Sequence, residues 1–449
     1  MKSICARGAS VAIVLTYLAS SAWCQDTGLP SLMPFPPLPA AGNGYAVSPA
    51  AANDALWGQA EPSPVQTSPI QSPIQGPDQL PGKSILGPDY TDAMKGGYES
   101  CGSIAGPCGG SVCCHNHYIY ANALLMNRLR PGGFATSFYA GNFDQAINFC
   151  NREFGRTWVG GFELGTGWCF GCTSNCALEA VYWGLYPSDE SARAQGNVSS
   201  LIDFDSLDYN GGNANDAFTN AQLHLLESSY TFHSVEFNLV GNGCCGGPFG
   251  CGMCGCCSGR SGSPWGYGYT LGFRYMNFTD GFLFSADPTD TAIDGDPQEL
   301  NYLGQFNNNL FGFQMGSGLS YCCCNSFTAY VIGKVGMYDN HVTGLQRVYG
   351  PASNATINNG PYQNEQAVVR TAGRETFAMS GQIDIGGRWA CSECWSINGG
   401  YRVLGLSGVA STEGNFQQAN FHDVDGMAFL ERSGSLLLHG AYAGVTYCW

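Results

Sequence analysis

Apolar and polar residues alternate with a period of two in several stretches after residue 116. In residues 265–275, WGYGYTLGFRY, every second residue is aromatic or leucine, and glycine, threonine or arginine lies between them. A period of two is typical of β-strands whose two faces meet different environments. Applied along the chain, it predicts ten antiparallel strands, at residues 117–127, 156–168, 177–187, 230–240, 265–277, 309–321, 327–339, 375–390, 395–407 and 436–448.

The apolar face of these strands favours an outer-membrane β-barrel. It begins or ends on tryptophan or tyrosine, as lipid-facing strands with aromatic girdles do. A soluble β-sandwich, the less favoured alternative, would bury this face and expose a more charged one. The predicted girdle consists of Trp158, Trp168, Trp265, Tyr267, Tyr275, Trp389, Trp395, Tyr447 and Trp449.

The opposite face is rich in glycine and is predicted to line the lumen. Inward charges in a narrow barrel usually pair with each other, because an unpaired buried charge is costly. About ten strands therefore favour a salt-bridged, filled lumen, whereas twelve or more would favour a pore. The predicted lumen residues are Glu163, Glu179, Glu236, Arg274, Gln314, Lys334, Asp384, Arg388 and Arg402.

The connections between the predicted strands alternate between short and long. Short or medium connections lie at 169–176, 241–264, 322–326 and 391–394, and bacterial barrels place short turns in the periplasm. The sequence thus predicts an all-β, up-and-down antiparallel barrel of 10–12 strands, with its C-terminus in the periplasm. Residues 278–304 are ambiguous, because they suit either a hairpin beyond the membrane or two more spanning strands.

Cysteines gather in the short and medium connections of this 22-cysteine chain. Two overlapping C-x2-C spacings, which can bind zinc or an iron–sulfur cluster, lie within 251–257. In an oxidising compartment disulfides that join the turns are favoured over metal, and their pairing is open. The cysteines concerned are Cys113, Cys114, Cys169, Cys172, Cys176, Cys244, Cys245, Cys251, Cys254, Cys256, Cys257, Cys322, Cys323, Cys324, Cys391, Cys394 and Cys448.

The N-terminal part divides into three segments. Residues 1–24 have the charged start, apolar run and small-residue site of a signal peptide. Residues 25–95 are Pro-rich and are predicted to be a disordered linker, either a plain tether or a spacer that contacts the cell wall. Residues 96–116 form a Cys-rich segment at the periplasmic rim, and 117–449 form the barrel.

The final strand resembles the signal that the barrel-assembly machinery recognises. Trp449 is preceded at alternate positions by Tyr447, Val445 and Ala443, so this machinery and outer-membrane lipid are the expected partners. A net charge of −16 argues against nucleic acid as a partner. The acidic stretch ADPTDTAIDGDPQEL (286–300) matches a Ca²⁺ loop poorly, so a solvated acidic surface is favoured and no metal or cofactor is predicted.

Four blocks carry a resemblance to a known family: GYTLGFRYMNFTDGFLF, NNNLFGFQMG, GGYRVLGLSGVA and LLLHGAYAGVTYCW. With the Pro-rich spacer, they resemble planctomycete-type outer-membrane barrels of the beta-barrel porin 7 (BBP7) family. The resemblance implies a porin-like barrel without an established substrate or functional residues. The cysteine load at the turns departs from it.

The expected function is therefore passive passage of ions or small solutes. The alternative is a closed structural or adhesive barrel whose external loops bind partners. Nothing assigns a nucleophile or a base, and no G-x-S-x-G elbow is present, so catalysis is not expected.

Overall fold

The structure is a computed structural model. It describes residues 104–105, 111–112, 117–129, 134–141, 144–149, 158–170, 176–242, 264–324, 327–358, 366–392, 394–416, 430 and 434–449. The predicted signal peptide and Pro-rich linker lie outside these residues, as does most of the Cys-rich segment.

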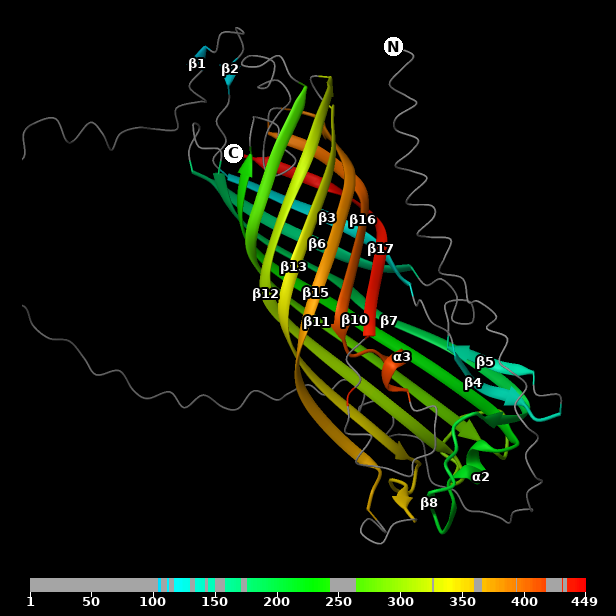
Figure 1. Cartoon of the computed structure of the whole chain (residues 1–449). Coiled ribbons are helices and arrows are strands. Elements are labelled where there is room, and N and C mark those ends of the chain that lie inside the picture. The colour runs from blue at the N-terminus through cyan, green and yellow to red at the C-terminus, as the bar shows by residue number, and fades with distance from the viewer. Residues whose placement is uncertain are drawn as a thin grey trace, which may run out of the picture. The chain divides into compact units, whose positions relative to one another are not determined.

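Ten antiparallel strands form one closed barrel (Figure 1). This confirms the predicted class and strand number. β7 pairs with β10 over most of their length and thereby closes the sheet. In sheet order the strands are β10 (Ala221–Asn242), β11 (Trp265–Asp287), β12 (Leu300–Cys324), β13 (Phe327–Tyr349), β15 (Val369–Ala390), β16 (Trp395–Val409), β17 (Gly434–Cys448), β3 (His117–Leu129), β6 (Trp158–Cys169) and β7 (Cys176–Ser200).

The smaller elements lie between these strands. β1 (Ile104–Ala105) and β2 (Ser111–Val112) pair only with each other. β4 (Phe134–Tyr139) pairs with β5 (Gln145–Phe149) and with the end of β7. β14 (Thr356–Ile357), β8 (Leu207–Tyr209) and β9 (Gly212–Asn213) form a three-stranded sheet, and α2 (Asn215–Phe218) and α3 (Thr412–Asn415) are single turns. Within the described residues, no helix has the length and apolarity that crossing a membrane requires.

The barrel has two unlike ends. At the short-turn end, at the top of Figure 1, residues 325–326 join β12 to β13 and residues 391–394 join β15 to β16. At the opposite end six adjacent strands, β7 to β15 in sheet order, continue well beyond the other four. They have 22–25 residues, compared with 12–15 in β16, β17, β3 and β6. A spanning strand needs only about 9–11 residues.

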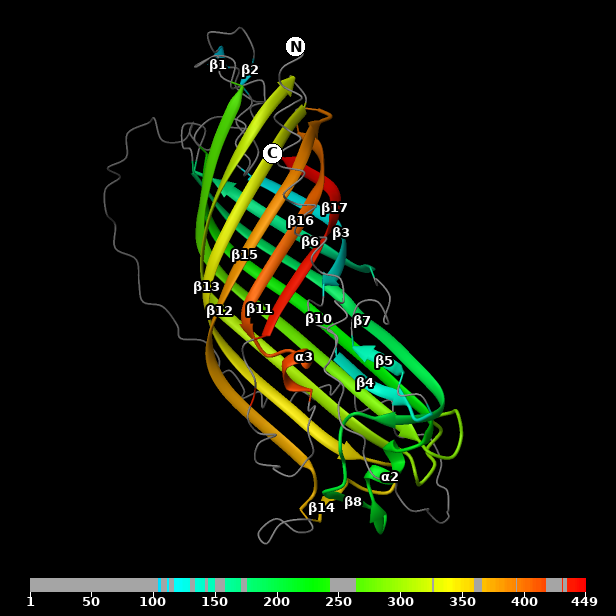
Figure 2. The same ribbon diagram turned by 45° about the vertical axis from the view of Figure 1, so that its right-hand side comes forward.

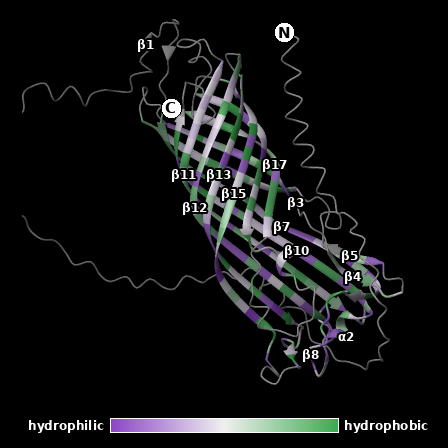
Figure 3. Ribbon diagram, in the orientation of Figure 1, coloured by the Kyte–Doolittle hydropathy of each residue, from purple (hydrophilic) through white to green (hydrophobic). Residues whose placement is uncertain are grey.

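These extensions correct one prediction. Most of the long connections expected at 188–229, 278–308 and 340–374 are strand, and the ambiguous residues 278–304 are a hairpin continuing β11 and β12. The reason is that the pattern inverts. Up to Tyr275 on β11 the outward residues are apolar, whereas beyond it Phe282 and Phe284 point inward and are fully buried. The period of two persists, but its apolar face changes side. Figure 3 shows that hydrophobic residues occur both in the upper barrel and along the long strands that reach the head.

A row of polar residues marks this inversion on the outer surface. Asn277, Asn309, His341 and Glu375 are successive cross-strand partners on β11, β12, β13 and β15. On the short-turn side of the row, the outward residues include exposed Phe313, Met337 and other large apolar side chains. The apolar band is the part of the surface that suits lipid, and the row lies at its edge.

Beyond the row the extended strands enclose a second hydrophobic core, which we call the head. Its buried side chains come from β5, β7, β8, β10, β11, β12 and β13, and from α2 and the segments around α3 and β14. Phe204 and Phe218 stack at 4.0 Å between ring centroids at its centre. Figure 2 shows the head elements α2, β8 and β14 gathered at the end of the long strands. The head is a folded unit built on one side of the barrel wall.

Candidate functional site in the barrel lumen

The nine residues predicted to line the lumen all occupy inward positions of the barrel strands. Seven of them are joined by ion pairs and hydrogen bonds into one network. The other two, Glu179 and Arg388, line a cavity toward the short-turn end. Four acidic and four basic side chains thus face each other. We call the connected group, with the neutral residues that join it, the polar network.

Arg402 on β16 is the centre of the first half of the network. Its guanidinium forms ion pairs with Glu163 on β6 and Asp384 on β15, and all three side chains are at least nine-tenths buried. β16 and β6 are three strands apart in the sheet, so the Arg402–Glu163 pair crosses the lumen. Two carboxylates compensate one cation here because a buried guanidinium has five donors to satisfy.

Glu236 on β10 is the centre of the second half. Lys334 Nζ lies 2.8 Å from Glu236 Oε2, and Arg274 Nε lies 3.4 Å from Oε1. Gln314 Nε2 donates to the same carboxylate at 2.7 Å, and Asn238 Nδ2 donates at 3.2 Å. This group therefore ties together β10, β11, β12 and β13.

Neutral amides join the halves and extend the network. Gln382 Nε2 donates to Asp384 at 2.7 Å, while Gln382 Oε1 accepts a 3.0 Å bond from Arg274. On the other side Asn122 donates to Glu163 at 2.6 Å and accepts from Asn398 at 2.7 Å. The amides thus connect the two halves, while Arg274 Nη2 and Gln314 Oε1 are buried without a hydrogen-bond partner among the described residues.

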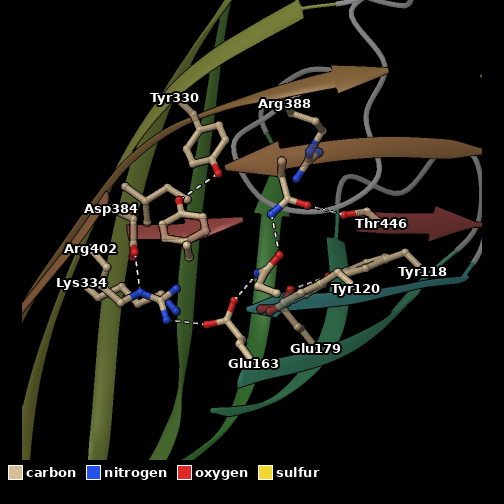
Figure 4. A pocket seen from close by; sticks show the side chains of 14 residues that line it. Tyr118, Tyr120, Glu163, Glu179, Tyr330, Lys334, Asp384, Arg388, Arg402 and Thr446 are labelled. Carbon is tan, nitrogen blue, oxygen red and sulfur yellow. Dashed lines mark hydrogen bonds and ion pairs between the residues drawn. The ribbon is translucent and has the colours of Figure 1, made fainter. Parts of the chain in front are cut away.

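A small cavity adjoins the network toward the short-turn end (Figure 4). Its volume is about 100 Å³, and its lining includes Glu179, Lys334, Arg388 and Thr446. Tyr118 donates its hydroxyl hydrogen bond to Glu179 at 2.8 Å. A cavity of this size holds a few water molecules or a small ion, since an engineered cavity that binds benzene measures about 150 Å³.

Tyrosine rings fill the space that glycines leave on the inward face. A Cβ atom at Gly167 would lie 2.0 Å from the ring of Tyr118, and one at Gly165 would lie 2.1 Å from that of Tyr120. The glycine-rich inward face of β6 is therefore the packing surface for two aromatic rings. The glycines therefore do not widen the lumen here, because the tyrosine rings fill the space beside them.

A layer of apolar side chains crosses the lumen beyond the polar network, toward the head. All ten barrel strands contribute to it. Trp183, Phe232, Met276, Phe278 and Leu310 are among its members and are fully buried. The layer lies between the polar network and the head. We call it the apolar layer.

The segment around α3 covers the apolar layer on the head side. Asn308 exchanges two hydrogen bonds of 2.8 Å with the backbone of Ala410, and Thr412 N donates to Asp280 Oδ2 at 2.8 Å. Asp280 in turn forms a fully buried ion pair with Arg128, at 2.6 Å. The connection after β16 is thereby fixed inside the barrel wall.

The predicted girdle residues lie on the outer surface. Eight of the nine are exposed and Tyr447 is half-buried. Trp168, His117, Trp449 and Tyr447 stack in succession, with centroid separations of 5.6–5.9 Å, around the short-turn end. Trp158 and Tyr275 lie further along their strands toward the head.

The described cysteines also lie at the short-turn end, within or beside the ends of barrel strands. They are Cys169, Cys176, Cys322, Cys323, Cys391, Cys394 and Cys448. Cys324 ends β12. The other predicted cysteines (Cys113, Cys114, Cys172, Cys244, Cys245, Cys251, Cys254, Cys256 and Cys257) lie outside the described residues, so the choice between disulfides and metal stays a prediction.

Sequence reasoning missed two groups of interior residues. Inward Tyr330 and Tyr442, whose hydroxyls lie 2.9 Å apart, were not singled out, although the period of two places both opposite the lipid face. Arg128 and Asp280 were assigned to loops, because they follow the point where the pattern changes.

Comparison with known proteins identifies the family. Residues 151–433 match the model of the family described as "Putative beta barrel porin-7 (BBP7)". No curated protein matches the chain.

Several solved outer-membrane proteins are similar over most of the chain. The outer membrane protease OmpT from Escherichia coli is 9% identical with a TM-score of 0.34, and the match covers 74% of this chain and 97% of OmpT. A major outer membrane protein from Thermus thermophilus is 11% identical with a TM-score of 0.28, covering 75% of this chain and 100% of that one. The Pseudomonas putida toluene transporter TodX is 7% identical with a TM-score of 0.22, covering 74% and 89%.

The family match covers more than half of the chain, and it agrees with the closed barrel, the outward apolar band and the inward charges. The chain therefore belongs to the beta barrel porin-7 (BBP7) family and is an outer-membrane β-barrel protein.

Proposed function

We propose that this protein is a closed structural barrel of the outer membrane whose head contacts other surfaces. One observation carries the proposal: every barrel strand contributes a buried apolar side chain to the apolar layer. Hydrated ions and polar solutes would have to leave their water to cross such a layer, at a cost of several kcal/mol for each unpaired polar group. The pairing of the lumen charges supports the same conclusion, because paired charges are not available to solutes.

The proposal places the short-turn end in the periplasm and the head outside the cell. Bacterial outer-membrane barrels have short periplasmic turns and longer external connections, which supports this orientation. The head then projects beyond the lipid on the outer side. Its outward face carries polar side chains such as Gln305, Thr343 and Thr371, which suit contact with water and with other cell-surface components.

We also propose that the protein is not an enzyme. The described residues include one close serine–histidine pair, in which Ser137 Oγ lies 2.7 Å from His224 Nδ1. Both residues are fully buried in the head, and the aromatic rings of Phe218 and Phe284 lie beside the imidazole. A catalytic pair must reach a substrate, so this arrangement supports a structural role.

Passive passage of ions or small solutes is the second candidate function. The cavity of about 100 Å³ favours it, because charged Glu179, Lys334 and Arg388 line a space toward the short-turn end. Passage would require the apolar layer and the α3 segment to move. The two functions therefore differ in whether the protein at rest conducts.

Single-channel conductance of the purified full-length protein in a planar bilayer tests the proposal. Insertion is checked by the heat-dependent shift in electrophoretic mobility that folded barrels give. We expect no conductance steps, with or without a reductant. Regular steps from the unaltered protein would contradict a closed barrel and establish passage, and a change of those steps on reduction would assign gating to the cysteines at the short-turn end.

Two variants control the assay. Trp183→Ala, combined with Phe232→Ala, removes two rings whose centroids lie 4.6 Å apart in the apolar layer, and with Asp280→Asn added to free the α3 segment it should produce conductance. Phe237→Ala lies on the same strand as Phe232 but faces outward, with 61% of its side chain exposed, and should remain silent.

A further inference from the structure

Three carboxylates converge at the far end of the head, in the connection from β11 to β12. Asp287 ends β11, and Asp290 and Asp296 lie in the following residues. One carboxylate oxygen from each of the three lies within 4.8 Å of the others. We call residues 287–299 the Asp287 loop.

Asp287 has a buried oxygen that nothing in the described part of the protein satisfies. The residue is fully buried, and its Oδ1 accepts hydrogen bonds from Thr289 N and Thr289 Oγ1, both at 2.7 Å. Its Oδ2 is buried and has no hydrogen-bond partner. An unsatisfied buried carboxylate oxygen is costly, and here it belongs to a cluster of three carboxylates. This combination indicates a missing positive ligand rather than a solvated acidic surface.

The loop contains no positive charge that could supply that ligand. Residues 287–299 include five acidic side chains and no lysine, arginine or histidine. Asp287, Asp290 and Asp296 form no ion pair with any residue that the structure describes.

Glu299 shapes the loop around this point. Its carboxylate accepts hydrogen bonds from Asp294 N at 2.7 Å and from Gly295 N at 3.0 Å, and Gly295 has a positive φ of 96°. These bonds turn the chain back so that Asp296 lies close to Asp287. Thr289 Oγ1 lies 3.2 Å from Asp296 Oδ2, which brings both halves of the loop together.

The ligand atoms suit calcium. Ca²⁺ takes about six to eight oxygen ligands in a flexible geometry, and carboxylates are among its usual ligands. Mg²⁺ requires a stricter octahedron and usually keeps several water molecules, which three carboxylates on one irregular loop serve less well. We propose that Asp287, Asp290 and Asp296 bind a calcium ion that ties the β11–β12 connection to the head. The spacing differs from that of an EF-hand loop, which explains why the sequence alone favoured a solvated surface.

Isothermal titration calorimetry of the full-length protein in detergent tests the site. After treatment with a chelator, Ca²⁺ is titrated to about 10 mM, because extracellular calcium sites bind at about 10⁻⁴–10⁻³ M. We expect one ion per chain, bound more tightly than Mg²⁺. Asp290→Asn combined with Asp296→Asn should weaken the binding at least tenfold.

Asp294→Asn is the control matched to Asp290→Asn alone, because each removes one negative charge from an exposed position of the same loop and Asp294 lies outside the cluster. It should change the affinity by less than about twofold. Absence of binding up to 10 mM Ca²⁺ would overturn the proposal. So would an equal loss of Ca²⁺ affinity in the Asp294→Asn and Asp290→Asn proteins, because a general attraction of counterions to the acidic loop predicts equal losses. Heat-dependent mobility shows whether the double variant folds, and the single Asp290→Asn variant, altered at an exposed residue, replaces it if not.

Discussion

The guanidinium of Arg402 lies over the indole ring of Trp183, with its central carbon 5.3 Å from the ring centroid. Arg274 approaches the same ring at 5.9 Å. Both distances are within the range of about 6 Å in which a cation and an aromatic face attract each other. Trp183 is a member of the apolar layer, so its ring is the boundary between that layer and the polar network. The polar network and the apolar layer are thus held together by these cation–π contacts.

Removing Arg402 alone should destabilise the protein more than removing Arg402 together with its two carboxylate partners. Arg402→Met leaves Glu163 and Asp384 without their shared cation and should lower the free energy of unfolding by about 3–5 kcal/mol. Adding Glu163→Gln and Asp384→Asn should restore most of that loss, because no buried charge then lacks a partner. Equilibrium urea unfolding in lipid vesicles measures both.

The exposed pair of His341 and Glu375 is the control for this experiment. Its side chains are 55% and 67% exposed, so Glu375→Gln should cost less than about 1 kcal/mol. A loss at Glu375 as large as that at Arg402 would contradict the assignment of stability to the lumen.

The polar row on the outer surface predicts how deep each strand position lies in the membrane. Val335→Arg, on the outward face of β13 within the apolar band, should cost about 2–4 kcal/mol. Thr343→Arg lies on the same strand and face but beyond His341, and should cost less than about 0.5 kcal/mol. Unfolding in vesicles compares them, and equal costs would place the membrane edge elsewhere.

The α3 segment should loosen when its anchor is removed. Asp280→Asn weakens the buried pair with Arg128 and the hydrogen bond from Thr412 N, so hydrogen exchange of the amides in 410–416 should accelerate by at least tenfold. Exchange in β13 should stay unchanged. Uniform acceleration throughout the barrel would mean that Asp280 stabilises the whole fold rather than this segment.

Acid should destabilise the head through His224. Burial in the head core lowers the pKa of His224 to about 3, so the imidazole is neutral in the folded protein. The unfolded chain takes up a proton below a pH of about 6.5, so the contribution of His224 is complete above that pH. It is lost as the pH falls toward 3, at about 1.4 kcal/mol per pH unit.

His224→Gln should remove this component of the pH dependence. The melting temperatures of the unaltered and His224→Gln proteins are compared from pH 7 to pH 4. Their difference separates the contribution of His224 from that of the carboxylates of the head. His341→Gln, at an exposed position, is the control. Parallel curves for the His224→Gln and unaltered proteins would show that His224 is not the acid-sensitive group.

The membrane part of the fold could be predicted from the sequence because lipid and lumen impose opposite demands on alternate residues. Glu163, Asp384 and Arg402 could be assigned to the lumen for the same reason. Which of them pair could not be predicted, because Arg402 and Glu163 are 239 residues apart and meet only when the barrel closes.

The head could not be predicted because the rule that found the strands reverses there. Phe282 and Phe284 follow a period of two, as the lipid-facing residues around Phe273 do on the same strand, but they point into a core. A pattern shows that two faces differ, and only the fold shows which face meets water. Arg128 and Asp280 lie at this reversal, so the buried ion pair was assigned to loops.

The unequal strand lengths give the barrel a direction within the plane of the membrane. β16, β17, β3 and β6 are adjacent and do not extend into the head. The other six strands, on the opposite side, extend together into the head. A neighbouring protein in the membrane therefore meets either the side with the six long strands or the side with the four short strands, depending on the direction from which it approaches. Arrays of such molecules can be ordered by rotation as well as by spacing.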